Sequence, residues 1–425
     1  MRTTTYRNTG PLPAAVAALA LLAGPQAAYA ATGPGGGACA FPVGNRFEGR
    51  PWPLQRVLLD ELWQDTEGKG VRVAVVDTGV DATHPQLAGA VDASAGADTI
   101  GGGDGTRDDA GHGTEVAGII AARPASGTGF VGLAPAATVI PIRQNDAHGS
   151  GTNATMAAAI RHAVARGAQV INISQETAGP LAETSVLGRA VAEAVARDIV
   201  VVASAGNGGT DGRRGRTYPA AFDGVLAVAA SDRNNERAPF SRPGAFVDVA
   251  APGVDIVSTV PGHGQCTDSG TSFAAPYVSG VAALMRAKYP HWTAAQIAAR
   301  IEQTAERSVN GRDDFVGWGV VDPVRALSGD DVPQDAPHPG PSPARAPAPD
   351  PAPLSTTETP QQRDRRHATA AMALTALLTG AVAGVAAVAR DLRRRRTTGG
   401  GRPRPDRRAQ PDRARRPVGS GRRTG

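Results

Sequence analysis

The strongest constraint on the fold is the alternation of short apolar segments with amphipathic segments between residues 71 and 305. Residues 71–77 (VRVAVVD) form a valine-rich run that ends at a Thr-Gly pair, as expected for a strand buried on both faces. The same pattern predicts further strands at 168–174, 199–207 and 225–232, and helices at 112–122, 152–167, 181–198, 272–288 and 293–305. This alternation predicts right-handed crossovers and a three-layer α/β fold, with a mostly parallel sheet covered by helices on both faces.

The two ends of the chain have the patterns of targeting and membrane segments. Residues 1–30 contain two arginines, an apolar run and the sequence AYA before Ala31, which predicts a secretory signal peptide cleaved after Ala30. An uncleaved N-terminal anchor is the alternative, but the apolar run is shorter than the roughly 20 residues that a span needs. Residues 368–389 contain no charged side chain and predict one transmembrane helix.

The positive charge of the chain is concentrated after this predicted span. Residues 390–425 carry 14 arginines and three aspartates, a net charge of +11, so the remaining residues carry −6 of the total of +5. Positive residues beside a span stay in the cytoplasm, which predicts a cytoplasmic tail near anionic lipid and an extracytoplasmic globular domain. The tail has no aromatic residue among its arginines, which argues against nucleic-acid binding.

The middle of the chain divides by composition. We expect an N-terminal extension at 31–68 with a helical stretch around 54–63, and a globular domain at 69–328. A linker at 329–367 follows, because ten prolines lie between residues 333 and 360. The chain has two cysteines, Cys39 and Cys266, both in the part predicted to be exported, where they can form a disulfide; two free thiols are the alternative.

Three short motifs carry candidate catalytic side chains at strand ends or helix starts. Asp77 ends the first strand, His112 opens a helix in GHGTEVAG, and Ser272 opens a helix in SGTSFAAP. Each has a structural alternative as a turn or capping residue. However, the carboxyl ends of parallel strands and the adjoining helix N-termini meet at one edge of a sheet. A serine nucleophile needs an imidazole base and a carboxylate that orients this base, so the three motifs together predict a catalytic triad.

A fourth group follows a buried strand in VVASAGNGG. Asn207 can donate its side-chain amide to the oxyanion of a tetrahedral intermediate, together with the backbone N–H of Ser272 at the helix N-terminus. A left-handed turn residue beside glycine is the alternative interpretation of Asn207.

These motifs, in the chain order Asp, His, Ser, resemble those of the subtilisin-like serine proteases over about residues 70–328. The matching stretches are V-V-D-T-G, H-G-T-x-V-A-G, S-A-G-N and G-T-S-x-A-x-P. The resemblance implies a subtilisin-like fold and an endopeptidase without a cofactor that forms an acyl-enzyme on Ser272, with His112 as base, Asp77 as its orienting carboxylate and Asn207 in the oxyanion hole. It also implies substrate-binding positions at Ser174, Ser204, Ala205 and Gly206.

Within this family the arrangement is most similar to the mycosins, which are membrane-anchored subtilases associated with type VII secretion. The shared features are a signal peptide, a short extension, the run G-T-S-F-A-A-P-Y-V-S-G, a proline-rich linker and one C-terminal span. The resemblance implies two partners, a protein or peptide substrate and the membrane complex of the secretion system. A structural subunit of that complex, with dispensable proteolysis, is the alternative function.

Two features depart from the family pattern. Gln175, Glu176 and Thr177 follow Ser174, where relatives carry glycine-containing stretches. Glu176 is expected either to face solvent or to favour a basic residue in the substrate. The extension at 31–68 is too short for the folding prodomain of secreted subtilisins, so we expect it to remain attached.

The sequence predicts no metal site. It lacks an H-E-x-x-H motif, which argues against a catalytic zinc ion. The loop DTIGGGDGTRDDAG offers Asp98, Asp104, Asp108 and Asp109 as oxygen ligands for calcium, but their spacing is not that of a recognised calcium loop. A solvated loop is therefore expected there, with calcium binding as the alternative.

Overall fold

The computed structural model describes residues 27–29, 44–211, 215–307, 309–329, 332–340 and 358–397. The chain forms two compact units, with the boundary between residues 344 and 345. Most of the predicted signal peptide, Cys39, and the tail beyond residue 397 lie outside the described residues.

A seven-stranded parallel sheet organises the first unit. Its strands follow the spatial order β11 (Val249–Pro252), β10 (Val225–Ser231), β8 (Val200–Ser204), β6 (Val170–Ile173), β2 (Arg72–Asp77), β4 (Thr138–Arg143) and β3 (Ala97–Asp98). A hydrophobic core lies on each face of the sheet. Because side chains alternate along a strand, Val73 and Val75 of β2 pack into one core, and Ala74 and Val76 pack into the other. The predicted α/β fold with a mostly parallel sheet is confirmed.

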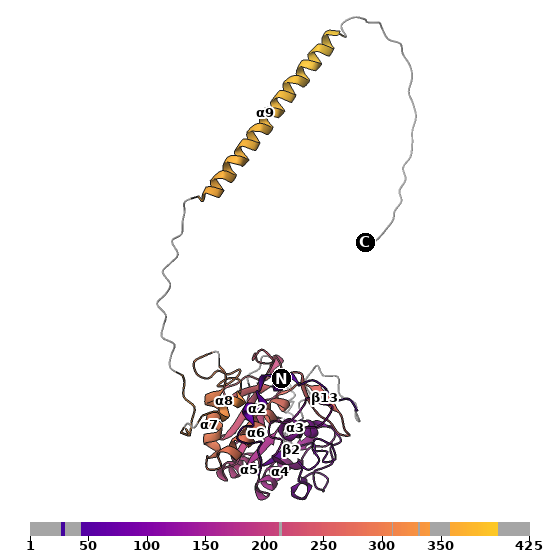
Figure 1. Ribbon diagram of the computed structural model, residues 1–425, viewed down its shortest axis with the longest axis vertical. Helices are drawn as coiled ribbons and strands as arrows, with labels where there is room; N and C mark the ends of the chain where they lie inside the picture. The colour runs from indigo at the N-terminus through magenta and orange to yellow at the C-terminus, as the bar shows by residue number, and fades with distance from the viewer. Residues whose placement is uncertain are drawn as a thin grey trace, which may run out of the picture. The chain divides into compact units, whose positions relative to one another are not determined.

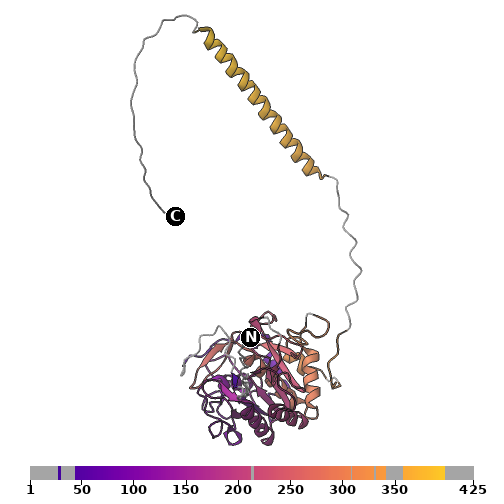
Figure 2. The ribbon, with the colours of Figure 1, turned by 180° about the vertical axis from the view of Figure 1, so that it is seen from behind.

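Helices cover both faces of this sheet. On one face lie α3 (His112–Ala121), α6 (Thr271–Lys288) and α7 (Ala294–Thr304), and on the other lie α4 (Asn153–Ala165) and α5 (Val186–Ala196). In Figure 1, α3 and α6 lie above β2, and α4 and α5 lie below it. Figure 2 shows from behind that the orange helices α7 and α8 (Pro323–Leu327) lie at one side of the unit.

Short elements complete the first unit. They are α1 (Trp52–Arg56), α2 (Leu59–Leu62), η1 (Ala93–Ala95), η2 (Gly209–Asp211), β1 (Ala27–Tyr29), β5 (Ser150–Thr152), β7 (Thr177–Ala178), β9 (Thr217–Tyr218), β12 (Ile256–Thr259) and β13 (Gln265–Asp268). The hairpin β12–β13 leads directly into α6, and its first strand packs on α3.

The described part of the N-terminal extension packs on the globular core. Leu54, Val57 and Leu62 are buried in the same cluster that holds α3 and α6. The indole N–H of Trp52 donates to the Val254 carbonyl at 2.9 Å, and that of Trp63 donates to the Leu133 carbonyl at 2.9 Å. The extension thus contributes both apolar surface and hydrogen bonds to the folded unit.

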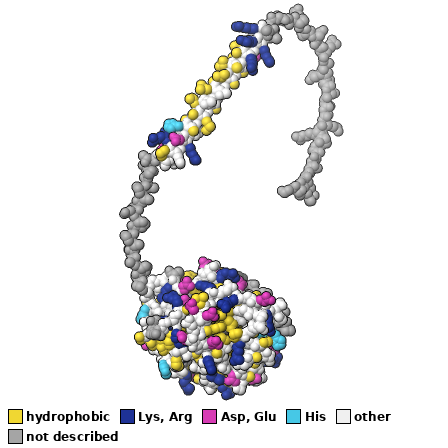
Figure 3. Space-filling view, viewed as in Figure 1, with side chains coloured by type: hydrophobic (Ala, Val, Ile, Leu, Met, Phe, Trp, Pro, Cys, Tyr) yellow, Lys and Arg dark blue, Asp and Glu magenta, His cyan; other side chains and the backbone are white. Residues whose placement is uncertain are grey.

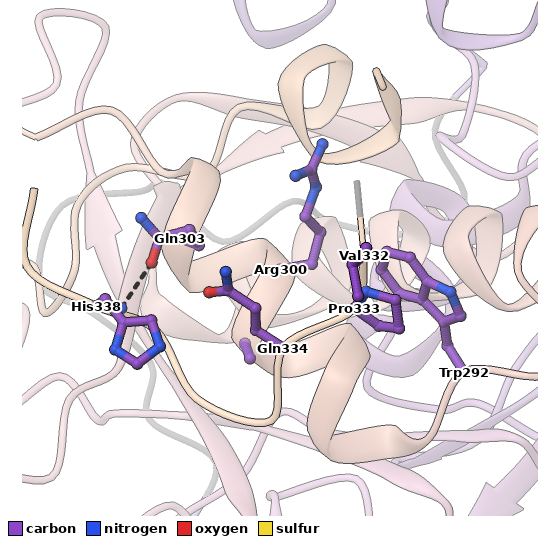
Figure 4. A pocket seen from close by; sticks show the side chains of 8 residues that line it. Trp292, Arg300, Gln303, Val332, Pro333, Gln334 and His338 are labelled. Carbon is purple, nitrogen blue, oxygen red and sulfur yellow. Dashed lines mark hydrogen bonds between the residues drawn. The ribbon is translucent and has the colours of Figure 1, made fainter. Parts of the chain in front are cut away.

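The first part of the predicted linker contacts α7. The Gln296 side chain donates to Asp335 at 3.1 Å, and the His338 N–H donates to the Gln303 side chain at 2.6 Å. Between these contacts lies a cavity of about 340 Å³, lined by Trp292, Arg300, Gln303, Val332, Pro333, Gln334 and His338 (Figure 4). The contacts of the globular unit therefore continue to residue 338.

The second unit contains α9 (Pro360–Thr397), which includes the predicted span at 368–389. Among the described residues it is the one helix long and apolar enough to cross a membrane. Figure 3 shows hydrophobic side chains along its middle and Lys or Arg side chains at both ends. This distribution is typical of a helix whose charged ends lie at the two membrane surfaces.

The burial of the extension predicts that two leucines of the same segment contribute differently to the free energy of unfolding. Leu62 is 2% exposed and Leu58 is 54% exposed. We expect Leu62→Ala to lower the free energy of unfolding by about 2–5 kcal/mol, because it leaves a cavity in the core. Leu58→Ala should change it by less than about 0.5 kcal/mol. Denaturant unfolding of the purified protein measures both, and equal effects would contradict a structural role for the extension.

Candidate active site

The side chains predicted to form the site lie at one edge of the sheet. Asp77 is the last residue of β2, Ser174 follows β6, and Ser204 is the last residue of β8. His112 is the first residue of α3, and Ser272 is the second residue of α6. Because β2, β6 and β8 are parallel neighbours, their carboxyl ends bring these residues together.

Asp77 and His112 form a direct hydrogen bond. Oδ1 of Asp77 lies 2.7 Å from Nδ1 of His112 and also accepts the N–H of Thr78 at 2.8 Å. The Asp77 side chain is fully buried and the His112 side chain is 17% exposed. Since Nδ1 carries the hydrogen in this bond, Nε2 of the neutral imidazole is left as the basic nitrogen.

Two glycines allow the backbone approach that this bond needs. A Cβ atom on Gly113 would lie 2.0 Å from the Gly79 carbonyl oxygen, and one on Gly79 would lie 2.0 Å from the Arg107 carbonyl oxygen. Gly79 also has a φ of +113°, which disfavours a larger residue. The start of α3 therefore rests directly on the turn after Asp77.

Opposing effects determine the charge of His112. Burial lowers the pKa of His112, but the charge and hydrogen bond of Asp77, with the charges of Glu115 and Asp108, outweigh burial and raise this pKa to about 9. Burial raises the pKa of Glu115 to about 8, although the neighbouring His112 lowers it. The site thus stabilises an imidazolium cation.

Ser272 lies in the first turn of α6, which packs against α3. Its side chain is almost fully buried, and its carbonyl oxygen accepts a hydrogen bond from the Ser174 hydroxyl at 2.7 Å. The ring of Phe273 lies 5.4 Å from the His112 imidazole, measured between centroids. In the described part of the chain Nε2 of His112 has no hydrogen-bond partner, so the Ser272–His112 bond is not formed here. This bond is often loose in enzymes without substrate.

Asn207 is held against the residue before Ser272. Its side-chain oxygen accepts the N–H and the hydroxyl of Thr271, both at 2.9 Å. The Thr271 hydroxyl also accepts the N–H of Gly206 at 3.1 Å, and Ala205 is fully buried. Asn207 is thus hydrogen-bonded to the first residue of α6, directly before Ser272.

Glu176 turns toward this group instead of facing solvent. Its Oε1 accepts the N–H of Asn207 at 3.3 Å, and its Oε2 is buried without a partner among the described residues. The carboxylate also lies directly over Gly206, because a Cβ atom there would be 1.8 Å from Oε2. Burial raises the pKa of Glu176, although the Asn207 N–H and the charge of Arg242 lower it.

Sequence analysis missed the role of Asp108. This residue does not belong to a solvated loop, since its carboxylate accepts hydrogen bonds from Thr78 at 2.8 Å and from both the N–H and the hydroxyl of Thr114. Asp98 likewise pairs with Arg143 at 2.8 Å. The described residues contain no group of three His, Cys, Asp or Glu side chains placed to hold a metal ion. The available signal for Asp108 was its position four residues before His112, at the entrance to a helix.

An extended segment of the chain lies beside the site. Residues 27–29 form β1, which pairs antiparallel with β5 from Ala27 opposite Thr152 to Tyr29 opposite Ser150. The same residues contact β7, which follows Glu176. The edge of β5 can therefore accept an extended peptide, here supplied by residues that sequence analysis assigns to the signal peptide.

Cys266 lies buried on β13, just before the turn that leads to Ser272. It is not a free thiol. Cys39 lies outside the described residues, so the Cys39–Cys266 disulfide stays a prediction.

The chain is similar to known proteins over most of its first unit. The model of the Subtilase family matches residues 68–319. Mycosin-4 of Mycobacterium tuberculosis (strain ATCC 25618 / H37Rv) is 42% identical over 316 residues, covering 65% of this chain and 69% of that protein. Thermitase of Thermoactinomyces vulgaris is 38% identical over 287 residues, covering 66% and 97% respectively. The solved structure of MycP3 protease from the type VII (ESX-3) secretion system has a TM-score of 0.59 at 35% identity, covering 72% of this chain and 93% of that chain.

The Asp77–His112 contact predicts the titration of the imidazole. In Asp77→Asn we expect the pKa of His112 to fall by roughly one to three units, because the attractive charge is lost while burial remains. Nuclear magnetic resonance of the imidazole signals across a pH series measures this shift. Asp104→Asn is the control, since Asp104 is exposed and hydrogen-bonds only within its own loop. Identical titration midpoints for Asp77→Asn and the unmodified protein would contradict the assignment.

Proposed function

The chain belongs to the Subtilase family, and from this premise we propose that Asp77, His112 and Ser272 carry its serine endopeptidase activity. The observation that carries the proposal is the Asp77–His112 hydrogen bond beside the first turn of α6, where Ser272 lies.

The proposed reaction is acyl transfer in two steps. The Ser272 hydroxyl attacks the carbonyl carbon of the scissile peptide bond while Nε2 of His112 takes its proton. The same nitrogen then gives this proton to the leaving amine, and an acyl-enzyme remains on Ser272. In the second step His112 takes a proton from water, the resulting hydroxide attacks the ester, and Ser272 recovers its proton. Asp77 stabilises the imidazolium that forms in each step.

We place the oxyanion hole between Asn207 and the start of α6. The Asn207 side-chain oxygen accepts both hydrogen bonds from Thr271, which fixes the orientation of a side chain whose amide group is the donor end. The backbone N–H of Ser272 lies in the first turn of α6, where orphan N–H groups and the helix dipole favour negative charge. Such donors stabilise the charge that develops in the transition state.

We propose that substrates bind as an added strand on β5. The pairing of β1 with β5 supports this, because it has the antiparallel geometry that an extended peptide would adopt. Such a peptide would pass between β5 and β7 before reaching Ser272, in the region of Ser174, Ser204, Ala205 and Gly206. Main-chain hydrogen bonds would then supply affinity without a demand for particular side chains.

Glu176 is our candidate for side-chain selection. Its carboxylate has one buried oxygen without a partner among the described residues and lies against Gly206, next to the proposed oxyanion hole. A buried carboxylate is stabilised by an opposite charge. We therefore propose that substrates with Lys or Arg just before the scissile bond are preferred.

We further propose a single-pass membrane protein with the protease domain outside the cytoplasm. The apolar middle of α9 and the arginines at its C-terminal end support a span with the tail inside. The similarity to mycosins and to the MycP3 protease from a type VII secretion system supports association with such a secretion complex.

Labelling with a fluorophosphonate tests the nucleophile and the topology together. A membrane-impermeant probe added to intact cells should modify Ser272, because the activated hydroxyl faces outward and His112 deprotonates it. Peptide mapping of the membrane fraction should locate the adduct on residues 271–288. Ser272→Ala and His112→Ala should abolish labelling.

The matched control is Ser269→Ala, which removes a serine hydroxyl three residues away and should leave labelling intact. Labelling only after the cells are opened would overturn the proposed orientation. No labelling in either state, with the folded protein present in the membrane, would overturn the catalytic assignment of Ser272.

Substrate preference tests Glu176. For peptides with Arg before the scissile bond, Glu176→Gln should lower kcat/KM roughly tenfold to hundredfold, because a charge-assisted hydrogen bond is lost. For matched peptides with Leu it should change little. Glu183→Gln, at an exposed position, is the control. If the unmodified enzyme cleaves the Leu peptides as well as the Arg peptides, Glu176 does not select a basic residue.

A further inference from the structure

Asp108 occupies the junction between the two segments that carry Asp77 and His112. It lies in the loop before α3, four residues before His112. We propose that Asp108 is a positioning residue that holds the start of α3, and with it His112, at hydrogen-bonding distance from Asp77. The proposal rests on the proposed function of His112 as the catalytic base.

One oxygen of Asp108 connects to the end of β2. Oδ1 accepts the hydroxyl of Thr78 at 2.8 Å, and Thr78 is the residue after Asp77. The Thr78 hydroxyl in turn accepts the N–H of Gly113 at 2.9 Å, and the Thr78 N–H donates to Asp77 at 2.8 Å. The Thr78 side chain therefore connects the turn after Asp77 to both Asp108 and the first turn of α3.

The carboxylate also caps α3. Oδ1 accepts the N–H groups of Ala110 at 3.2 Å and Gly111 at 2.8 Å, and Oδ2 accepts the N–H of Thr114 at 2.8 Å and its hydroxyl at 2.6 Å. Gly111 is the N-cap residue and has no side chain to do this. Asp108 therefore accepts, from outside the helix, the hydrogen bonds that an N-cap side chain normally accepts from the first backbone N–H groups.

This double attachment fixes where His112 lies. His112 is the first residue of α3, so its ring position follows the position of the helix N-terminus. With five protein donors, the carboxylate uses all of its roughly four lone-pair sites and has little freedom to rotate. A change in Asp108 would move α3 relative to β2, and small displacements of a catalytic group are costly in rate.

Asp108 also bears on the charge of His112. Burial raises the pKa of Asp108, whereas its hydrogen bonds from Thr114, Thr78 and the Gly111 N–H lower it, and the ionised carboxylate attracts the imidazolium. The ionisable groups around the imidazole are Asp77 on β2, Asp108 in the preceding loop and Glu115 on α3, and all three raise the pKa of His112. Asp268 on β13 acts on Glu115 in turn. Removal of the Asp108 charge should therefore lower the pKa of His112.

The test compares Asp108→Asn with Asp109→Asn in the full-length protein. The amide group introduced by Asp108→Asn would present its N–H donors to the N–H of Thr114, so this bond to the helix is lost, while the Thr114 hydroxyl can turn to accept and an acceptor for Thr78 remains. We expect kcat to fall about 10- to 100-fold with little change in KM. The acid limb of the kcat/KM profile and the His112 titration should both move to lower pH. Asp109→Asn, an exposed neighbour, should change none of these.

A second pair of variants keeps the carboxylate intact. Thr114→Val removes one donor to Asp108, and Thr114→Ser restores it, so kcat should fall in the first and recover in the second. If Asp108→Asn does not fold, this pair still tests whether the hydrogen bond from the Thr114 hydroxyl to Asp108 affects kcat. Loss of thermal stability without a change in kcat, in the pH profile or in the His112 titration would make Asp108 purely structural and overturn the proposal.

The same experiment separates this inference from the proposed function. If the unmodified protein neither hydrolyses peptides nor reacts with a fluorophosphonate, the proposed function fails. The His112 titration needs no activity, so a shift in Asp108→Asn would still support positioning, and an unchanged titration would still count against it.

Discussion

The register of the parallel sheet is the constraint on which the site depends. Val76 of β2 lies opposite Ile142 of β4 and Ile173 of β6, so β2 and β6 end at the same height and deliver Asp77 and Ser174 to one edge. Both helices that carry the remaining groups start at this edge. A slip of β2 by one residue would place Asp77 where Val76 packs into the core and Thr78 at the edge, because the side-chain period of a strand is two. The pairing of the strands thus determines where Asp77 and Ser174 lie, as well as the architecture of the sheet.

The proposed nucleophile is fixed by a helix that is buried along most of its length. In α6 every residue from Thr271 to Arg286 is buried, which is unusual for a surface helix and typical of a central one. Polar bonds then set its position along its axis: Ser279 donates to the Asn172 side chain at 2.9 Å, and Ser174 donates to the Ser272 carbonyl at 2.7 Å. Apolar burial alone would tolerate small shifts of this helix, whereas these bonds do not.

The parts that the sequence predicted are those with a local signal. The strands β2, β6, β8 and β10 are continuous apolar runs, and Asp77, His112, Ser272 and Asn207 each stand at the boundary of such an element. The strand β4 was not predicted, because Pro141 normally argues against an interior strand. It is tolerated because its outer neighbour, β3, pairs only through Ala97 and Asp98, beyond Pro141. The role of Asp108 depends on contacts with Thr78, 30 residues away, which leave no periodic trace in the sequence.

The three carboxylates near His112 illustrate why residue type alone does not assign a role. Asp77 touches Nδ1 and is therefore the orienting group. Asp108 is the same residue type, but its oxygens are occupied by donors from Thr78, Thr114 and the loop backbone, so it acts on the imidazole only through position and charge. Burial raises the pKa of Glu115 to about 8, while the neighbouring His112 lowers it. Glu115 and His112 therefore titrate as a coupled pair, in which the charged form of each favours the charged form of the other.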